Sequence, residues 1–221
     1  MQQRSVNLTF HGIGDPARSL APGEAEVWLS RRQFEATLDS LSGRDDVLIT
    51  FDDSNLSDLE YALPALRRRG LTATFFVVAG KLGAPGFLDQ QDVRTLAAEG
   101  MAIGCHGMRH RPWRGLDWHA LREELIDARR LLEQVVERAV TDAACPFGSY
   151  DRRVLRWLRR CGYCRIYTSD RGTARSNDWL QARNTVRPGD VPGFVDHVLS
   201  LESTPHDVLR QSLRRAAKRW R

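Results

Sequence analysis

Short apolar, β-branched runs alternate along this chain with longer segments in which apolar residues recur at helical spacing. Strands that alternate with amphipathic helices are typical of βα units around a parallel sheet. The apolar runs predict strands at residues 6–10, 47–51, 73–78, 101–105, 141–145, 165–168 and, more weakly, 184–186. Seven is a barrel-like number of strands, so the pattern favours a single α/β barrel.

The segments between these runs predict helices that begin at capping residues and end at glycines. They cover residues 30–41, 57–69, 89–99, 117–137 and 151–160, and Gly70, Gly100 and Gly162 follow three of them. We expect the barrel domain to span residues 1–204. Residues 205–221 form a separate basic segment whose apolar positions are spaced for an amphipathic C-terminal helix.

Polar residues gather directly after the predicted strands. His11 follows the first strand, Asp52 and Asp53 follow the second, and the segments 105–110, 146–150 and 169–170 follow three later ones. In parallel barrels the C-terminal strand ends form one rim, and active sites are built there. The pattern therefore predicts that these separate segments meet at one site.

Composition and charge narrow the class of protein. With 42% hydrophobic and 28% charged residues, the chain can bury a core, which excludes wholesale disorder. The net charge of +5 is concentrated in residues 210–221, so we expect no nucleic-acid partner for the barrel. The basic tail either docks its apolar stripe on the domain or lies on a membrane surface.

The chain contains no apolar run of the roughly 18 to 20 residues that cross a bilayer, and its N-terminus does not resemble a signal peptide. We expect a cytoplasmic protein, located at the inner membrane surface if the tail binds lipid. In that compartment the four cysteines are expected to be reduced thiols.

The adjacent carboxylates Asp52 and Asp53 indicate a cation, because like charges raise one another's pKa unless a positive charge lies nearby. A capping or loop role is the ordinary alternative for two such residues. His106 and His110 are four residues apart, and in a helical turn both imidazoles would reach the same ion. With Asp53 they make two nitrogen ligands and one oxygen ligand, which leaves room for water and substrate.

Three segments resemble the motifs of the polysaccharide deacetylases, the NodB-homology or carbohydrate esterase four family. Residues 50–53 are similar to the first motif, 104–110 to the second and 146–150 to the third, in matching order and spacing. The likeness covers nearly the whole chain. It implies a distorted (β/α)7-type barrel in a single domain and the hydrolysis of N-acetyl groups, occasionally N-formyl groups, on sugars.

The resemblance also implies roles for single residues. Asp53, His106 and His110 would bind one divalent metal ion, and Asp52 would be the general base. Zinc is the first expectation, with cobalt, nickel, manganese and iron also compatible with such ligands. The backbone N–H of Phe147 would stabilise the oxyanion, and Tyr150 would lie at the substrate.

The sequence departs from the family pattern in three places. Ser54 replaces the usual Gly, Ala144 replaces the usual Arg that pairs with the catalytic Asp, and the late motif with the acidic His has no clear match. Two hypotheses follow: Arg183 pairs with Asp52, and His11 acts as the general acid or lines the same pocket. Asp170 would orient His11 or Arg183, or cap the following turn.

These features predict a metal-dependent N-deacetylase that acts on a small-molecule or lipid-linked N-acetylated sugar. Two alternatives stay open: a non-catalytic carbohydrate-binding relative, and a hydrolase of a non-sugar linear amide. The basic tail adds the prospect of peripheral membrane contact. The sequence leaves the oligomeric state open.

Overall fold

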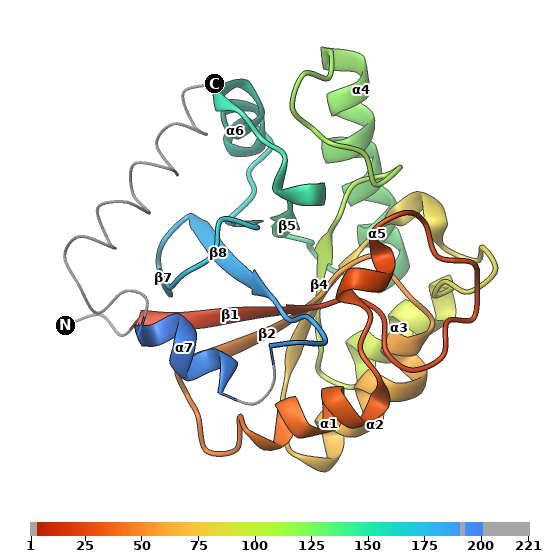
Figure 1. The fold of residues 1–221 in the computed structure, drawn as a ribbon. Coiled ribbons are helices and arrows are strands. Elements are labelled where there is room, and N and C mark those ends of the chain that lie inside the picture. The colour runs from red at the N-terminus through yellow and green to blue at the C-terminus, as the bar shows by residue number, and fades with distance from the viewer. Residues whose placement is uncertain (1–3, 191–192, 201–221) are drawn as a thin grey trace.

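The computed structural model describes residues 4–190 and 193–200, and seven parallel strands close into a barrel (Figure 1). The barrel order is β2-β3-β4-β5-β6-β8-β1, and β1 pairs with β2 to close it. The strands are β1 (Arg4–Phe10), β2 (Val47–Phe51), β3 (Ala73–Val77), β4 (Ala102–Cys105), β5 (Asp142–Ala144), β6 (Arg165–Thr168) and β8 (Leu180–Thr185). The prediction of a (β/α)7-type barrel is confirmed.

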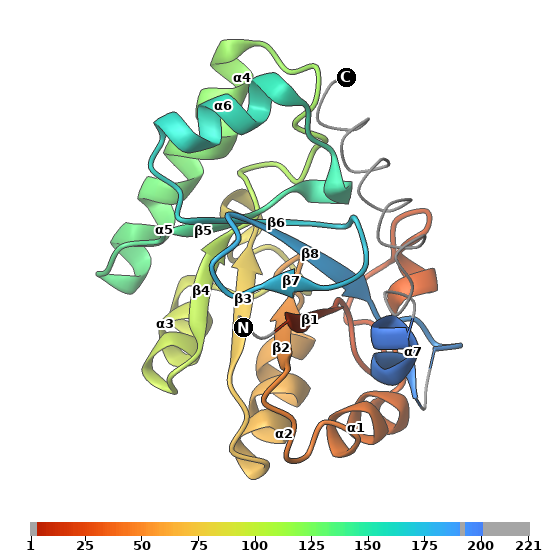
Figure 2. The ribbon, with the colours of Figure 1, turned by 90° about the vertical axis from the view of Figure 1, so that its left-hand side faces the viewer.

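Helices surround the strands on the outside of the barrel (Figure 2). They are α1 (Arg31–Asp39), η2 (Asp58–Ala62), α2 (Leu63–Arg68), α3 (Gln90–Ala98), α4 (Trp118–Arg122), η4 (Glu123–Asp127), α5 (Ala128–Val136), α6 (Arg152–Arg160) and α7 (Phe194–Ser200). Short 3-10 turns are η1 (Glu24–Val27), η3 (Ala79–Lys81) and η5 (Pro146–Gly148). Side chains of Ser30, Asp89, Asp117 and Asp151 accept hydrogen bonds from the first turns of α1, α3, α4 and α6, which fixes where each helix begins.

The main core lies between the strands and the helices. Phe10, Phe51 and Phe75 follow one another across β1, β2 and β3, and the last two rings stack with centroids 4.6 Å apart. Phe34 of α1 meets the Phe10 ring edge-on at 5.1 Å. Because all four rings are buried, truncating one of them to Ala would cost about 3–5 kcal/mol.

A second and smaller apolar cluster consists of Phe76, Ala144 and Tyr167. These side chains come from β3, β5 and β6. The side chain of Thr50 on β2 belongs to the same region, since the Arg183 guanidinium reaches Thr50 and also lies 5.1 Å from the Phe76 ring. Alternate strand residues share a face, so Asp52, two residues after Thr50, is expected to project to the same side.

The last part of the barrel differs from the sequence prediction. The weak strand predicted at 184–186 is the longer strand β8, and the two-residue strand β7 (Ala174–Arg175), which pairs antiparallel with β1, was not predicted. The reason is that the buried side chains of β8 are mostly polar. Gln181, Arg183 and Asn184 are each almost fully buried, so the strand lacks the apolar pattern that would identify it.

Three further expectations concern the rest of the chain. The predicted C-terminal helix at 205–221 lies outside the described residues. Among the residues that the structure describes, no helix combines the length and apolar character needed to cross a membrane. The four cysteines are free thiols, in agreement with the expectation from the sequence.

Candidate active site

The predicted rim exists, and it collects charged side chains from four strands. His11 follows β1, Asp52 and Asp53 follow β2, and His106 follows β4, while Arg183 lies on β8. Asp52, Asp53, His106 and Arg183 are all almost completely buried. So many buried ionisable groups are costly unless they neutralise one another or bind an ion.

An unusual backbone turn brings the two aspartates to the same imidazole. Neighbouring residues of a regular strand point to opposite faces, but Asp53 has φ 76° and Ser54 has φ 63°. With this turn, Asp53 Oδ1 lies 3.5 Å from His106 Nε2, and Asp52 Oδ2 lies 3.6 Å from the same nitrogen. The left-handed conformation explains why a Gly would suit position 54. Ser54 is held there because its Oγ accepts a hydrogen bond of 2.8 Å from the Val78 N–H.

The two histidines do not lie on a helical turn, so the helical geometry expected from their spacing is wrong. Residues 106–110 form a loop, and His110 has φ 51°. The rings nevertheless come together, with centroids 5.0 Å apart. His110 Nε2 lies 2.9 Å from Asp53 Oδ1. The left-handed conformation of His110 therefore brings the two imidazoles together, as the four-residue spacing of a helix would have done.

These three side chains fit a divalent metal ion. Asp53, His106 and His110 each offer one ligand atom, and these atoms all lie within 4.8 Å of one another. His106 Nδ1 lies 2.9 Å from the Ala144 carbonyl, which can only accept a hydrogen bond, so in the neutral ring Nε2 presents a lone pair. A lone pair that faces two carboxylates needs a cation between them.

The electrostatics of the site point the same way. Burial raises the pKa of Asp53, but the imidazoles of His106 and His110 outweigh it and hold this pKa well below its usual range. Burial lowers the pKa of His106, and the charges of Asp52 and Asp53 more than reverse the effect. The site thus keeps its carboxylates ionised and attracts positive charge.

Arg183 is the partner of Asp52, as the sequence hypothesis stated. Its Nη1 and Nη2 donate to Asp52 Oδ1 and Oδ2, each at 2.7 Å. Such a bidentate pair fixes both the charge and the orientation of the carboxylate. Burial raises the pKa of Asp52, but the charges of Arg183 and His106 bring it below its ordinary value. Arg183 reaches Asp52 from β8, whereas the position of the missing Arg, Ala144, lies on β5.

His11 lies at the same rim. Its Nδ1 is buried and has no hydrogen-bond partner within the described residues. Burial lowers the pKa of His11, although the charges of Asp53 and Asp52 oppose this shift. The opposing charges place His11 within electrostatic reach of both aspartates.

The third motif forms the turn η5 at the edge of the site. Phe147 has φ 55° and a ring that is 66% exposed, and that ring lies 4.6 Å from the His110 ring. The hydrogen bonds of the turn run from Gly148 to Cys145 and from Ser149 to Pro146. Neither uses the N–H of Phe147, so, as far as residues 4–190 and 193–200 are concerned, this donor stays available beside the predicted metal ligand.

Tyr150 and Asp170, both predicted to lie near the substrate, contact one another. The Tyr150 hydroxyl donates to Asp170 Oδ2 at 2.5 Å, and the Thr168 hydroxyl donates to the same oxygen at 2.9 Å. Tyr150 is buried. The pair therefore links the end of the third motif to the end of β6.

Asp58 is a buried carboxyl near the site that the sequence analysis did not select. Burial, together with the charges of Asp53 and Asp52, raises its pKa well above the usual range. Asp58 lies at the start of the helix predicted at 57–69, where acidic residues are common, so its residue type and position did not distinguish it.

Comparisons with known proteins point to one family. The polysaccharide deacetylase family model matches residues 41–166, more than half of the chain. YxkH of Bacillus subtilis (strain 168), named as a polysaccharide deacetylase, is 27% identical over 170 residues, which are 77% of this chain and 58% of YxkH. The chain thus spans little more than half the length of that relative.

Two further relatives extend the comparison. A chitooligosaccharide deacetylase of Rhizobium leguminosarum bv. trifolii is 27% identical over 163 residues, 72% of this chain and 68% of that protein. Among solved structures, the Streptococcus pyogenes deacetylase PplD in complex with acetate superimposes with a TM-score of 0.79 at 19% identity. The match covers 90% of this chain and 99% of PplD, and at that identity it supports the fold alone.

Proposed function

The chain belongs to the polysaccharide deacetylase family, and from this premise we propose that it is a metal-dependent hydrolase that removes N-acetyl groups from an amino sugar or glycan precursor. One observation carries the proposal. Asp53, His106 and His110 converge on one point, and the ionised carboxylate of Asp52 lies beside them. That arrangement unites a metal site with a base.

Asp53, His106 and His110 would hold the ion, with zinc as the first expectation and cobalt, nickel, manganese or iron as alternatives. When bound, a divalent ion polarises the amide carbonyl and lowers the pKa of water from that of the bulk liquid toward roughly 7 to 9. The protein's contribution is to fix the ligands. The contact between His106 Nδ1 and the Ala144 carbonyl orients one of them.

Asp52 would remove the proton from the attacking water. Its ion pair with Arg183 keeps it ionised and holds its two oxygens in a fixed plane. The new C–O bond forms as negative charge moves onto the carbonyl oxygen, where the Phe147 N–H would donate. A donor of this kind contributes about 3 kcal/mol in enzymes where it has been removed.

His11 would complete the reaction by giving a proton to the departing amine as the C–N bond breaks. The products are then acetate and a free amino sugar. The proposal is supported by the position of His11 at the rim and by the charges of Asp53 and Asp52, which oppose the lowering of its pKa by burial. Arg183 would orient Asp52, and the Tyr150–Asp170 pair would support the third motif, without entering this proton balance.

A substrate with N-acetylated sugar units is supported by the names of the relatives, one of which is a chitooligosaccharide deacetylase. We propose a small-molecule or lipid-linked sugar. The decisive test is acetate release from a panel of N-acetylated sugars by the metal-loaded protein, with Asp52→Asn as the control. The expected result is release that depends on Asp52. Equal release by both proteins, or none by either, would overturn the proposed hydrolase.

A further inference from the structure

Residues 106–113 form a loop that contains both histidines of the site and is held in an unfavourable backbone conformation. Gly107 has φ 83° and His110 has φ 51°. A left-handed non-glycine residue costs about 1–2 kcal/mol, and such conformations persist only where surrounding contacts enforce them. The loop must therefore be fixed by something outside itself.

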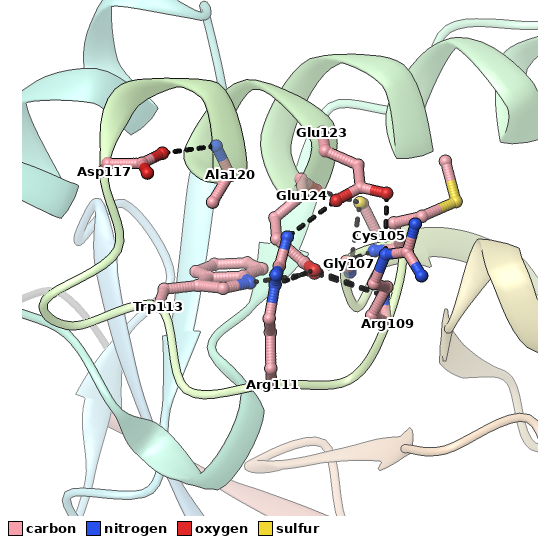
Figure 3. A network of polar contacts seen from close by, with 10 residues as sticks. Cys105, Gly107, Arg109, Arg111, Trp113, Asp117, Ala120, Glu123 and Glu124 are labelled. Carbon is pink, nitrogen blue, oxygen red and sulfur yellow. Dashed lines mark hydrogen bonds and ion pairs between the residues drawn. The ribbon is translucent and has the colours of Figure 1, made fainter.

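The carboxylate of Glu124 supplies those contacts. It accepts hydrogen bonds from the Met108 N–H at 2.8 Å and, more weakly, from the Arg109 N–H at 3.3 Å. Its other donors are Arg111 Nε at 2.8 Å and Trp113 Nε1 at 3.4 Å. All four donors come from the loop, and Glu124 is 0% exposed. Figure 3 shows the Glu124 side chain among Arg109, Arg111 and Trp113.

The loop sequence is matched to this carboxylate at Gly107. A Cβ at that position would lie 2.2 Å from Glu124 Oε2, which is far inside van der Waals contact. Gly107 therefore meets two requirements at once, the left-handed backbone and the close approach of Glu124. The Gly107 N–H also points to Cys105 Sγ at 3.4 Å, which ties the start of the loop to β4.

The carboxylate comes from η4, a π-helical segment in the long helix that runs from α4 to α5. Leu121, Leu125 and Ala128 of this helix are fully buried and anchor it on the barrel. Isolated π-helical turns inside α-helices are frequent at functional sites. Glu124 is therefore a rigid anchor for the loop rather than a mobile surface group.

We propose that Glu124 is a positioning residue that holds loop 106–113 in the conformation in which His106 and His110 face Asp53, so that the ligand set is formed before the ion binds. This inference rests on the metal site of the proposed function. Partners of this kind around metal sites change metal affinity by about 10–100-fold when they are mutated. A buried carboxylate that only stabilised the fold would leave the affinity of the folded protein unchanged.

The test compares Glu124→Gln with Glu123→Gln in the full chain. Glu123 neighbours Glu124 on η4, and it pairs with the side chains of Arg109 and Arg111 at 2.7 and 2.6 Å. No described bond joins it to the loop backbone, so it controls for the loss of one charge. We expect Glu124→Gln to raise the dissociation constants for Zn²⁺ and Co²⁺ about 10–100-fold, and Glu123→Gln to raise them less than about 3-fold.

A second measurement needs no metal. The amide protons of Met108 and Arg109 should exchange faster with solvent in metal-free Glu124→Gln than in the wild type, and at the wild-type rate in Glu123→Gln. If Glu124→Gln does not fold, Glu124→Asp keeps the charge but withdraws the carboxylate by one methylene. This variant should still lose about 10-fold or more in affinity.

The outcomes separate the two proposals. If the wild type and Glu124→Gln bind Zn²⁺ with equal affinity, the proposed role of Glu124 is overturned and the proposed function stays intact. An equal loss in Glu124→Gln and Glu123→Gln would also overturn it. Wild-type protein that binds no ion, or that binds it as Asp53→Asn does, would overturn the metal site and this inference with it.

Discussion

Replacing Arg183 by Met should destabilise the protein by several kcal/mol, because it leaves Asp52 as an unpaired buried charge. Arg183 is 2% exposed and makes two bonds of 2.7 Å to Asp52. Each hydrogen bond between charged groups contributes about 1.5–3 kcal/mol. Two of them give about 3–6 kcal/mol, consistent with the roughly 3–5 kcal/mol lost when one partner of a buried pair is removed.

The assay is urea unfolding of the metal-free protein, since a bound ion would add its own stabilisation. Asp52→Asn should also destabilise, because it strands Arg183. The double variant should be more stable than either single one and lie within about 2 kcal/mol of the wild type. A loss below about 1 kcal/mol for Arg183→Met, or a double variant no more stable than the single ones, would refute the reasoning.

The pH dependence of this effect has a definite sign. The folded protein holds the pKa of Asp52 below its ordinary value of 3.8, so the ionised carboxylate contributes stability that is fully present above pH 3.8. That contribution disappears as the pH falls through the lower folded value. In the wild type, urea unfolding should therefore show that the contribution of ionised Asp52 is lost only below pH 3.8.

Three further predictions test other parts of the site. His11→Ala should reduce kcat about 10²–10⁴-fold with unchanged metal content, measured by acetate release and elemental analysis; retained turnover would remove His11 from the acid role. Ser54→Gly relieves about 1 kcal/mol of left-handed strain. It also removes the acceptor of the Val78 N–H, and leaving this buried donor unpaired costs about 1–3 kcal/mol. The net change in unfolding free energy should be a loss, and a gain would contradict this balance. Burial raises the pKa of Cys105 to about 11, so peptide mapping after alkylation at pH 8 should find the exposed Cys164 modified and Cys105 protected until the protein unfolds.

Most of the fold could be predicted because burial of one face of a helix or strand gives its apolar residues a regular spacing in the sequence. Strands β1 to β6 and the starts of the helices predicted at 30–41, 57–69, 89–99, 117–137 and 151–160 lie within a few residues of their predicted positions, whereas α7 is not among these predicted helices. The pattern failed at β8, where Asn184 donates to the Gly172 carbonyl and Gln181 to those of Arg175 and Asp178. Hydrogen bonds to backbone carbonyls of residues 172–178 satisfy these buried side chains, and an apolar period along the chain does not reveal such partners.

In the candidate site, too, features set by nearby residues could be predicted, whereas those set by contacts with other elements could not. Asp53, His106 and His110 could be selected because their residue types are ordinary metal ligands at familiar spacings. The conformation of the loop that carries the two histidines could not be predicted, because it depends on Glu124. An acidic residue in a predicted helix would ordinarily be expected to face solvent. Nothing within residues 106–113 reveals that a carboxylate from another element accepts four of their donors.

The replacement of the usual Arg by Ala144 is explained by the positions of side chains in the folded barrel rather than by their order in the sequence. Ala144 on β5 cannot pair with Asp52, yet Arg183 on β8 delivers a guanidinium to the same carboxylate. The Ala144 backbone still serves the site, because its carbonyl contacts His106. Charge balance around Asp52 requires a guanidinium in the barrel interior but does not dictate the strand that supplies it. An arginine supplied by a different strand therefore keeps Asp52 ionised, and a missing motif residue is weak evidence for a lost activity.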